Sequence, residues 1–263
     1  MEYDHSRKAG NRGDVWKHLV LVALADVIPV LSDTCYYVDC HAGAPEHELR
    51  PGGEWERGVG DAIQKVPSDC RYCEIASAWL RSNKYPAAWV FIVSILAKRF
   101  TRVHAALFDT ADQVAGKYPP TSSLGIPSNV VVEFTHADGF AAAQRVCKAD
   151  LIFIDPPFYP DAEADWKAST AVCQELAQRG LPFVVWYPFY WPTKPQHFVS
   201  ATGCAAWEVS WTPRGSKPSQ NLKGCGMLIS NTLAPFFRGV ETELRRVSRC
   251  VKWEFLVRNP SAL

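Results

Sequence analysis

A regular alternation of short apolar runs with longer stretches of helical spacing constrains the fold of this chain most strongly. Seven runs rich in β-branched or aromatic residues lie at 35–40, 104–109, 129–134, 150–155, 183–188, 205–211 and 226–231. Most are apolar at nearly every position, which is typical of strands buried on both faces. Stretches such as 139–147 and 164–180 have the spacing of helices. The pattern predicts an α/β fold with a seven-stranded, mostly parallel sheet between helices.

Two segments do not follow this alternation. Residues 1–31 have a polar start followed by an apolar helical stretch, and residues 45–90 are rich in Pro, Gly, Trp and charge. A helix is predicted at 73–83 inside the second segment. With 263 residues, 48% of them hydrophobic, the chain can bury one sizeable core. We therefore expect a single domain over 1–263, with an N-terminal helical segment and a helical insertion at about 45–90.

Charge and hydropathy exclude few partners. The formal net charge is +1, which neither requires nor rules out a nucleic acid, because a basic face can exist on a neutral protein. The longest apolar stretch, 19–31, contains Asp26 and Pro29 and is too short to span a bilayer. It also lacks the flanks of a signal peptide. These features predict a cytoplasmic protein without a membrane contact.

The nine cysteines are odd in number and scattered, which fits a reducing compartment. Only Cys70 and Cys73 form a close pair, and a tetrahedral zinc site needs a second pair of ligands that the sequence lacks. We expect one turn of helix carrying both cysteines, with zinc or redox chemistry as the alternative. No metal is expected.

Polar or small residues follow three of the predicted strands, at the sheet edge where α/β proteins bind ligands. The turn "DCHAGA" contains Gly43 but not the G-x-G-x-x-G of a dinucleotide loop, so an ordinary tight turn stays open. Asp109 can accept hydrogen bonds from ribose hydroxyls or cap a helix. Asp138-Gly139 can meet an adenine edge or form a plain Asp-Gly turn.

The fourth strand runs into Asp155-Pro156-Pro157-Phe158, the most specific motif of the chain. An exocyclic amino group on a base is a poor nucleophile, because its lone pair is delocalised into the ring. The Asp155 carboxylate and the Pro156 carbonyl can each accept one of its hydrogens, and the prolines make these acceptors rigid. Phe158 can stack on the base. The alternative is a strand-terminating Asp-Pro turn.

The motif resembles that of S-adenosylmethionine-dependent methyltransferases acting on adenine N6. Further segments, in order, are similar to the RlmJ family of 23S ribosomal RNA adenine-N6 methyltransferases: "YDHSRKAGNRGDVWKH" (3–18), "YVDCHAGA" (37–44), "ADGF" (137–140), "LIFIDPPF" (151–158), "WYP" (186–188) and "GMLISN" (226–231). The resemblance covers most of the chain and is weakest over 45–90. It implies a class I methyltransferase fold, S-adenosylmethionine as cofactor, a single-stranded or loop RNA substrate and a monomer.

The resemblance also implies roles for individual residues. The cofactor would be held by His18, His41, Gly43, Ser94, Asp109, Asp138, Gly139 and Asp155, with Lys17 in support of either ligand. Asp155, Pro156 and Phe158 would be catalytic, and Tyr3 would close over the target adenosine together with Phe158. Pro45 stands where the family has glycine, and Phe158 where it has tyrosine, which indicates a divergent member.

Two other functions stay open at this point. A DNA adenine-N6 methyltransferase would use the same four residues of the Asp-Pro-Pro-Phe motif. A non-catalytic RNA-binding protein could retain the fold without binding S-adenosylmethionine.

Overall fold

The computed structural model describes residues 5–111, 121–158, 162–190, 193–212 and 222–258. Its centre is an eight-stranded sheet in the order β10-β8-β9-β7-β6-β1-β4-β5. The strands are β1 (Thr34–Asp39), β4 (Arg102–Asp109), β5 (Val130–His136), β6 (Leu151–Ile154), β7 (Phe183–Pro188), β8 (Ala205–Ser210), β9 (Gly224–Ile229) and β10 (Glu254–Arg258). Strands β5, β4, β1, β6 and β7 are parallel, and β9, β8 and β10 add antiparallel pairs.

The predicted α/β class is confirmed, but the predicted count of seven strands is wrong by one. The additional strand, β10, lies at an edge of the sheet and pairs only with β8. Its residues are partly exposed. Because an edge strand is not buried on both faces, its sequence "EFLVR" lacks the continuous apolar run that marks the central strands.

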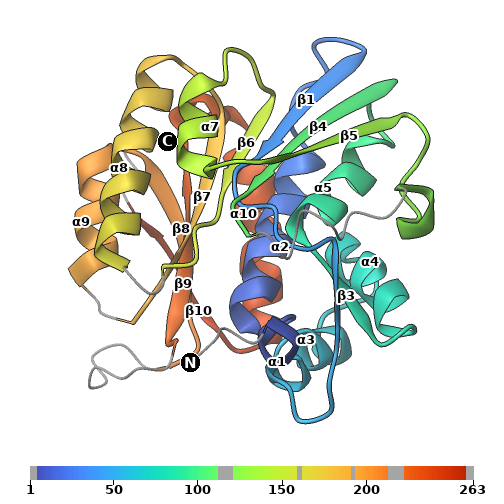
Figure 1. Cartoon of the computed structure of the whole chain (residues 1–263). Coiled ribbons are helices and arrows are strands. Elements are labelled where there is room, and N and C mark those ends of the chain that lie inside the picture. The colour runs from blue at the N-terminus through green and yellow to red at the C-terminus, as the bar shows by residue number, and fades with distance from the viewer. Residues whose placement is uncertain (1–4, 112–120, 159–161, 191–192, 213–221, 259–263) are drawn as a thin grey trace.

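Helices cover the sheet in two layers, as Figure 1 shows. One layer holds α2 (Arg12–Ala25), α5 (Ala88–Leu96) and α10 (Phe237–Cys250), and the other holds α7 (Gly139–Arg145), α8 (Ala162–Gln178) and α9 (Thr193–Thr202). A hydrophobic cluster fills the space between each layer and the sheet. Apolar side chains from both sides therefore fix the central strands.

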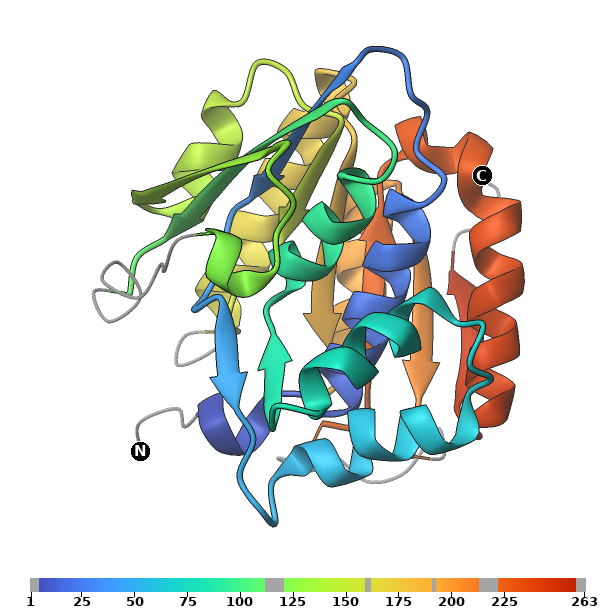
Figure 2. The same ribbon diagram turned by 90° about the vertical axis from the view of Figure 1, so that its right-hand side faces the viewer.

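The chain between β1 and α5 forms a smaller unit beside the sheet (Figure 2). Strands β2 (Glu46–Glu48) and β3 (Lys84–Pro86) pair in an antiparallel ribbon. Between them lie η1 (Glu54–Arg57), α3 (Val59–Lys65) and α4 (Arg71–Leu80). Cys70 is the residue that precedes α4, Cys73 lies in its first turn, and both are buried. The remaining short elements are α1 (His5–Lys8), η2 (Thr121–Leu124) and η3 (Asn231–Phe236).

The described residues contain no group of three or more His, Cys, Asp or Glu side chains placed to hold a metal ion. They also contain no helix of the length and hydropathy that a membrane span requires.

Helix α2 is the element of the N-terminal segment that reaches the candidate site. Asn11 caps it, because its side chain accepts a hydrogen bond from the Asp14 N–H at 3.1 Å. Ten of its fourteen residues are buried, so the helix lies inside the molecule rather than on its surface. It packs against α5, α4, α10 and β9. This packing places the polar residues of α2 among buried groups.

Candidate active site

The Asp155 carboxylate follows directly after β6 and meets a lysine from α2. Lys17 Nζ lies 2.8 Å from Asp155 Oδ2 and 2.9 Å from Asp14 Oδ1. The three side chains are only 13%, 16% and 22% exposed for Lys17, Asp155 and Asp14. Asp14 also accepts a hydrogen bond from the Gly10 N–H at 2.9 Å. A single ammonium group thus bridges two largely buried carboxylates.

Burial and charge act in opposite directions on these three groups. Burial raises the pKa of Asp155, and the Lys17 ammonium opposes the rise without cancelling it. Burial also acts to lower the pKa of Lys17, but Asp14 and Asp155 together raise it above its ordinary value. For Asp14, burial is outweighed by the charge of Lys17 among others, so its pKa is lowered. Lys17 therefore stays charged, and its charge favours the ionised form of Asp155.

His41 contacts the backbone of the Asp-Pro-Pro-Phe motif. The Asp155 N–H donates a hydrogen bond to His41 Nδ1 at 3.3 Å, and the His41 ring lies edge-on to Phe140 with centroids 4.9 Å apart. Burial lowers the pKa of His41 to about 4. The ring is therefore neutral near pH 7, with Nδ1 free to accept this hydrogen bond.

Asp39, the last residue of β1, fixes the turn that carries His41. Its carboxylate is fully buried and accepts hydrogen bonds from the Tyr37 hydroxyl at 2.8 Å and the His41 N–H at 3.1 Å. Burial raises the pKa of Asp39 to about 7. These contacts link the end of β1, through His41, to the residue that follows β6.

Asp109 and Gly43 meet at the carboxyl ends of β4 and β1. Asp109 Oδ2 accepts a hydrogen bond from the Gly43 N–H at 2.9 Å, and Oδ1 accepts one from the Ala111 N–H at 2.8 Å. Gly43 has a φ of 63°, and a Cβ added there would have no neighbour within 4 Å. The glycine thus permits a left-handed turn with open space beside it.

Asp138 and Gly139 form the start of α7. Asp138 is exposed and caps the helix, because its Oδ1 accepts a hydrogen bond from the Ala141 N–H at 2.7 Å. Gly139 packs directly on the first turn, since an added Cβ would lie 1.7 Å from the Cys40 carbonyl oxygen. Only glycine therefore allows the loops after β1 and β5 to approach each other this closely.

His18 lies next to Lys17 in sequence but faces a different set of groups. Its Nδ1 is 2.8 Å from the Tyr85 hydroxyl, which lies 3.0 Å from the Tyr72 hydroxyl. The ring is 3% exposed, and Nε2 has no hydrogen-bond partner among the described residues. Burial holds the pKa of His18 well below its usual value, so the ring is neutral. A buried ring nitrogen without a partner is costly, and a ligand group would satisfy it.

Two predicted residues are not brought to this cluster by the described structure. Ser94 lies in α5, where its hydroxyl donates a hydrogen bond to the Val90 carbonyl at 2.7 Å. This contact is the usual one for a serine within a helix. Tyr3 lies outside the described residues.

Phe158 occupies an aromatic cluster rather than an open surface. Its side chain is 5% exposed, and its ring centroid lies 4.6 Å from that of Trp166 and 6.1 Å from that of Trp186. Its φ of 50° is uncommon for a bulky residue. Pro156 is buried and Pro157 exposed. Stacking of Phe158 on a base stays a prediction, and it requires the ring to leave this cluster.

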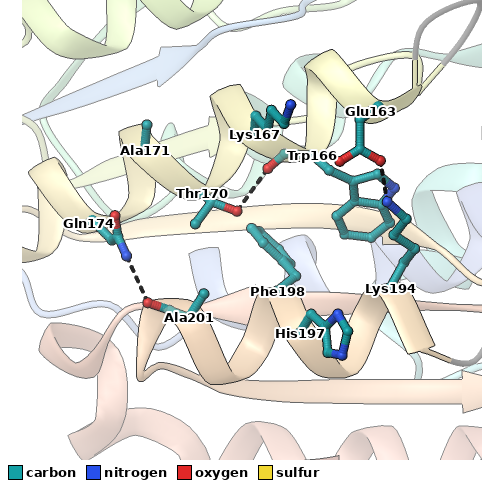
Figure 3. A pocket seen from close by; sticks show the side chains of 10 residues that line it. All are labelled: Glu163, Trp166, Lys167, Thr170, Ala171, Gln174, Lys194, His197, Phe198 and Ala201. Atoms are coloured by element: carbon teal, nitrogen blue, oxygen red, sulfur yellow. Dashed lines mark hydrogen bonds and ion pairs between the residues drawn. The ribbon is translucent and has the colours of Figure 1, made fainter.

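Trp166 also lines a cavity of about 350 Å³ between α8 and α9 (Figure 3). Lys167 and His197 lie at its exposed sides, and Lys194 is ion-paired with Glu163 across it. Trp166 therefore belongs both to this cavity and to the aromatic cluster around Phe158.

Sequence reasoning missed three residues of the site: Asp14, Asp39 and Trp166. Asp14 lies three positions before Lys17, the spacing at which helical side chains meet, and that spacing was a usable signal. Asp39 ends an apolar strand just as Asp155 follows one, which was a second signal. No local signal marks Trp166, because its contact with Phe158 depends on how α8 packs.

Comparison with known proteins gives two curated relatives and a structural match. The ribosomal RNA large subunit methyltransferase J of Escherichia coli is 28% identical over 72% of this chain and 70% of its own length. The protein of the same name from Haemophilus influenzae is 22% identical over 88% of this chain and 87% of its own length. The crystal structure of a Legionella pneumophila protein matches with a TM-score of 0.78 and 19% identity, over 95% of this chain and 97% of that one. No family model matches the chain.

Proposed function

We propose that this chain, whose sequence is similar to two ribosomal RNA large subunit methyltransferase J proteins, transfers a methyl group from S-adenosylmethionine to N6 of an adenine in RNA, most specifically 23S ribosomal RNA. The observation that carries the proposal is the Asp155 carboxylate, held at the end of β6 by Lys17 at 2.8 Å and followed by Pro156. This arrangement supports a role for the Asp155 carboxylate and the Pro156 carbonyl as two fixed acceptors for the hydrogens of an amino group.

The residues present fit S-adenosylmethionine. His18 offers a buried ring nitrogen without a partner, which suits the polar methionine end of the cofactor. Gly43 leaves open space beside the Asp109 carboxylate, which suits a ribose with two hydroxyls. Gly139 lets the backbone after β5 approach closely, as an adenine edge requires. When bound, this cofactor supplies an electrophilic methyl group on a sulfonium centre.

The two carboxylate oxygens of Asp155 have different partners in this proposal. Oδ2 is held by Lys17, whereas Oδ1 accepts no hydrogen bond from the described residues. Oδ1 is thus available for one N6 hydrogen of the adenine, while the Pro156 carbonyl accepts the other. With both hydrogens held, the nitrogen lone pair is turned out of the ring system and can attack. The raised pKa of Asp155 then suits it to take the proton that the methylated nitrogen releases.

The Asp155 side chain is only 16% exposed. The target adenine must therefore leave its stack to reach it, so a loop or other single-stranded region is the expected substrate. We further propose that the chain acts as a monomer in the cytoplasm.

Tritium transfer from labelled S-adenosylmethionine tests the proposal. Unmodified 23S ribosomal RNA should accept label, whereas duplex DNA should not. Label in duplex DNA alone would favour the DNA methyltransferase. No heat of binding with S-adenosylmethionine in calorimetry would instead favour a non-catalytic RNA-binding protein.

A further inference from the structure

The sheet is covered unevenly on the side of α7, α8 and α9. Strands β6, β8 and β9 are buried at every residue, but β4 alternates. Its residues Val103, Ala105 and Leu107 are buried against the α5 layer. Helix α7 has only seven residues and covers the other side of β4 in part. Figure 2 shows β5 at the outer edge of the sheet.

The side chains on the uncovered side form a surface that we call the open face. It is hollowed by a cavity of about 400 Å³ whose lining includes Tyr36, His104, Val131, Glu133, Arg145 and Lys148. Tyr36 is 36% and Val131 40% exposed, which is unusual for large side chains in the middle of strands. An open apolar surface on a folded chain indicates a binding site.

Two stacked aromatic rings belong to this open face. Tyr36 and His104 are register partners on β1 and β4, with ring centroids 5.5 Å apart and planes within 16° of parallel. The Tyr36 N–H donates a hydrogen bond to Asp150 Oδ2 at 2.8 Å, which holds the backbone beneath the ring. The two rings are thus stacked on each other, and a base can extend this short stack on an outer ring face.

Cationic side chains lie near the Tyr36–His104 ring pair. Lys148 Nζ lies 4.8 Å from the centroid of the Tyr36 ring, and Arg145 borders the same cavity. Arg102 shares the side of β4 that carries His104, because alternate residues of a strand face the same way. Arg102, Arg145 and Lys148 are thus three cations, and among the described residues that line the cavity the one acid is Glu133. None of the three has an ion-pair partner among the described residues, so all are available to phosphates.

We propose that the open face of β1, β4 and β5 binds a single-stranded segment of the RNA substrate, with bases on Tyr36 and His104 and phosphates at Lys148 and Arg145. The inference rests on the proposed function for its choice of RNA. The α8–α9 cavity is the weaker candidate, since one of its two lysines is already ion-paired with Glu163. Binding at the open face would anchor RNA outside the site where an adenine is methylated.

Fluorescence anisotropy with a short labelled single-stranded RNA tests this, using the full chain without cofactor. Tyr36→Ala should weaken binding roughly 10-fold, as loss of a base-stacking ring does. Tyr36→Phe keeps the ring and should bind like the wild type. Lys148→Glu should weaken binding and lower the slope of log affinity against log salt by about 1. Lys167→Glu, in the α8–α9 cavity, is the matched control and should change neither quantity.

The same RNA annealed to its complement should bind more weakly, because its bases are not free to stack. Crosslinking of 4-thiouridine RNA should label a peptide containing Tyr36. Unchanged binding by both Tyr36→Ala and Lys148→Glu would overturn the proposal, as would a loss confined to Lys167→Glu. A wild-type dimer that Tyr36→Ala dissociates would overturn it too, by showing that a second chain covers the face.

Failure here is separable from failure of the proposed function. Normal methyl transfer with unaltered RNA affinity in Tyr36→Ala would leave the proposed function standing and remove this inference. RNA binding that depends on Tyr36, in a protein that transfers no methyl group, would support this inference and remove the proposed function.

Discussion

Replacement of Lys17 by methionine removes the charge between Asp14 and Asp155 while keeping an unbranched side chain of similar length. Two carboxylates then face each other with no cation between them. Removing one partner of a buried ion pair costs about 3–5 kcal/mol. Because these side chains are 13% to 22% exposed, water screens part of that cost. We therefore expect the free energy of unfolding to fall by about 2–3 kcal/mol.

The same change should reduce methyl transfer more than it reduces folding. Without Lys17, burial and the Asp14 carboxylate both act to raise the pKa of Asp155 further, so less of it is ionised near pH 7. A rate loss of about 100-fold or more is expected, as for loss of an acid–base group. The acidic limb of the pH–rate profile should move to higher pH, so that alkaline buffer recovers part of the rate.

Single-turnover transfer across pH, together with urea unfolding, measures both effects. Lys17→Arg retains the charge and is the control for stability. The double variant Lys17→Met/Asp14→Asn should regain stability, because the facing carboxylate is gone, but not the rate. A Lys17→Met protein with the wild-type rate and an unmoved acidic limb would refute the role given to this lysine.

Three further predictions follow from buried groups of the site. The pKa of Asp39 is about 7 in the folded chain against 3.8 ordinarily, so its protonated form stabilises the fold below pH 4 and that contribution is lost as pH rises through 7. Denaturant unfolding at several pH values measures how the free energy of unfolding depends on pH, and Asp39→Asn should remove up to about 4 kcal/mol of that dependence. Parallel curves of this free energy against pH for the two proteins would contradict the prediction. Gly139→Ala should lower stability by at least about 3 kcal/mol, because its Cβ would meet the Cys40 carbonyl; a melting temperature equal to the wild type would show that the contact is wrong. His18→Phe should keep or raise stability while weakening S-adenosylmethionine binding roughly 10-fold in calorimetry, through loss of one hydrogen bond to a charged group; unchanged affinity would separate His18 from the cofactor.

Continuous apolar runs made the central strands predictable, since burial on both faces leaves a direct mark in the sequence. The strand Glu254–Arg258 left no such mark, because one edge of it stays partly exposed. The similarity to RlmJ proteins was likewise predictable from segments spread along the chain, and two curated relatives, at 28% and 22% identity, support it.

The site was predictable where side chains stand at strand ends. Parallel topology brings such residues to one edge, and there Gly43 meets Asp109 and His41 meets the Asp155 backbone. Contacts between distant elements were less accessible. The bridge from α2 to Asp155 joins residues 138 positions apart, and its strength depends on burial that no local pattern records.

Packing also decides whether the side chain of a motif residue is exposed or covered. Phe158 was predicted from its place in the motif to offer a stacking surface, yet its ring is covered by Trp166 and Trp186. The environment of a side chain depends on neighbouring helices, and the four residues of the motif do not encode it.

The most direct measurement is nucleoside mass spectrometry of 23S ribosomal RNA incubated with S-adenosylmethionine and either the wild-type protein or Asp155→Asn. We predict that the wild-type protein forms N6-methyladenosine and that Asp155→Asn, which still binds the cofactor in calorimetry, forms almost none. Formation of N6-methyladenosine by Asp155→Asn at the wild-type rate, or methylation of a different atom by the wild-type protein, would contradict the proposed chemistry.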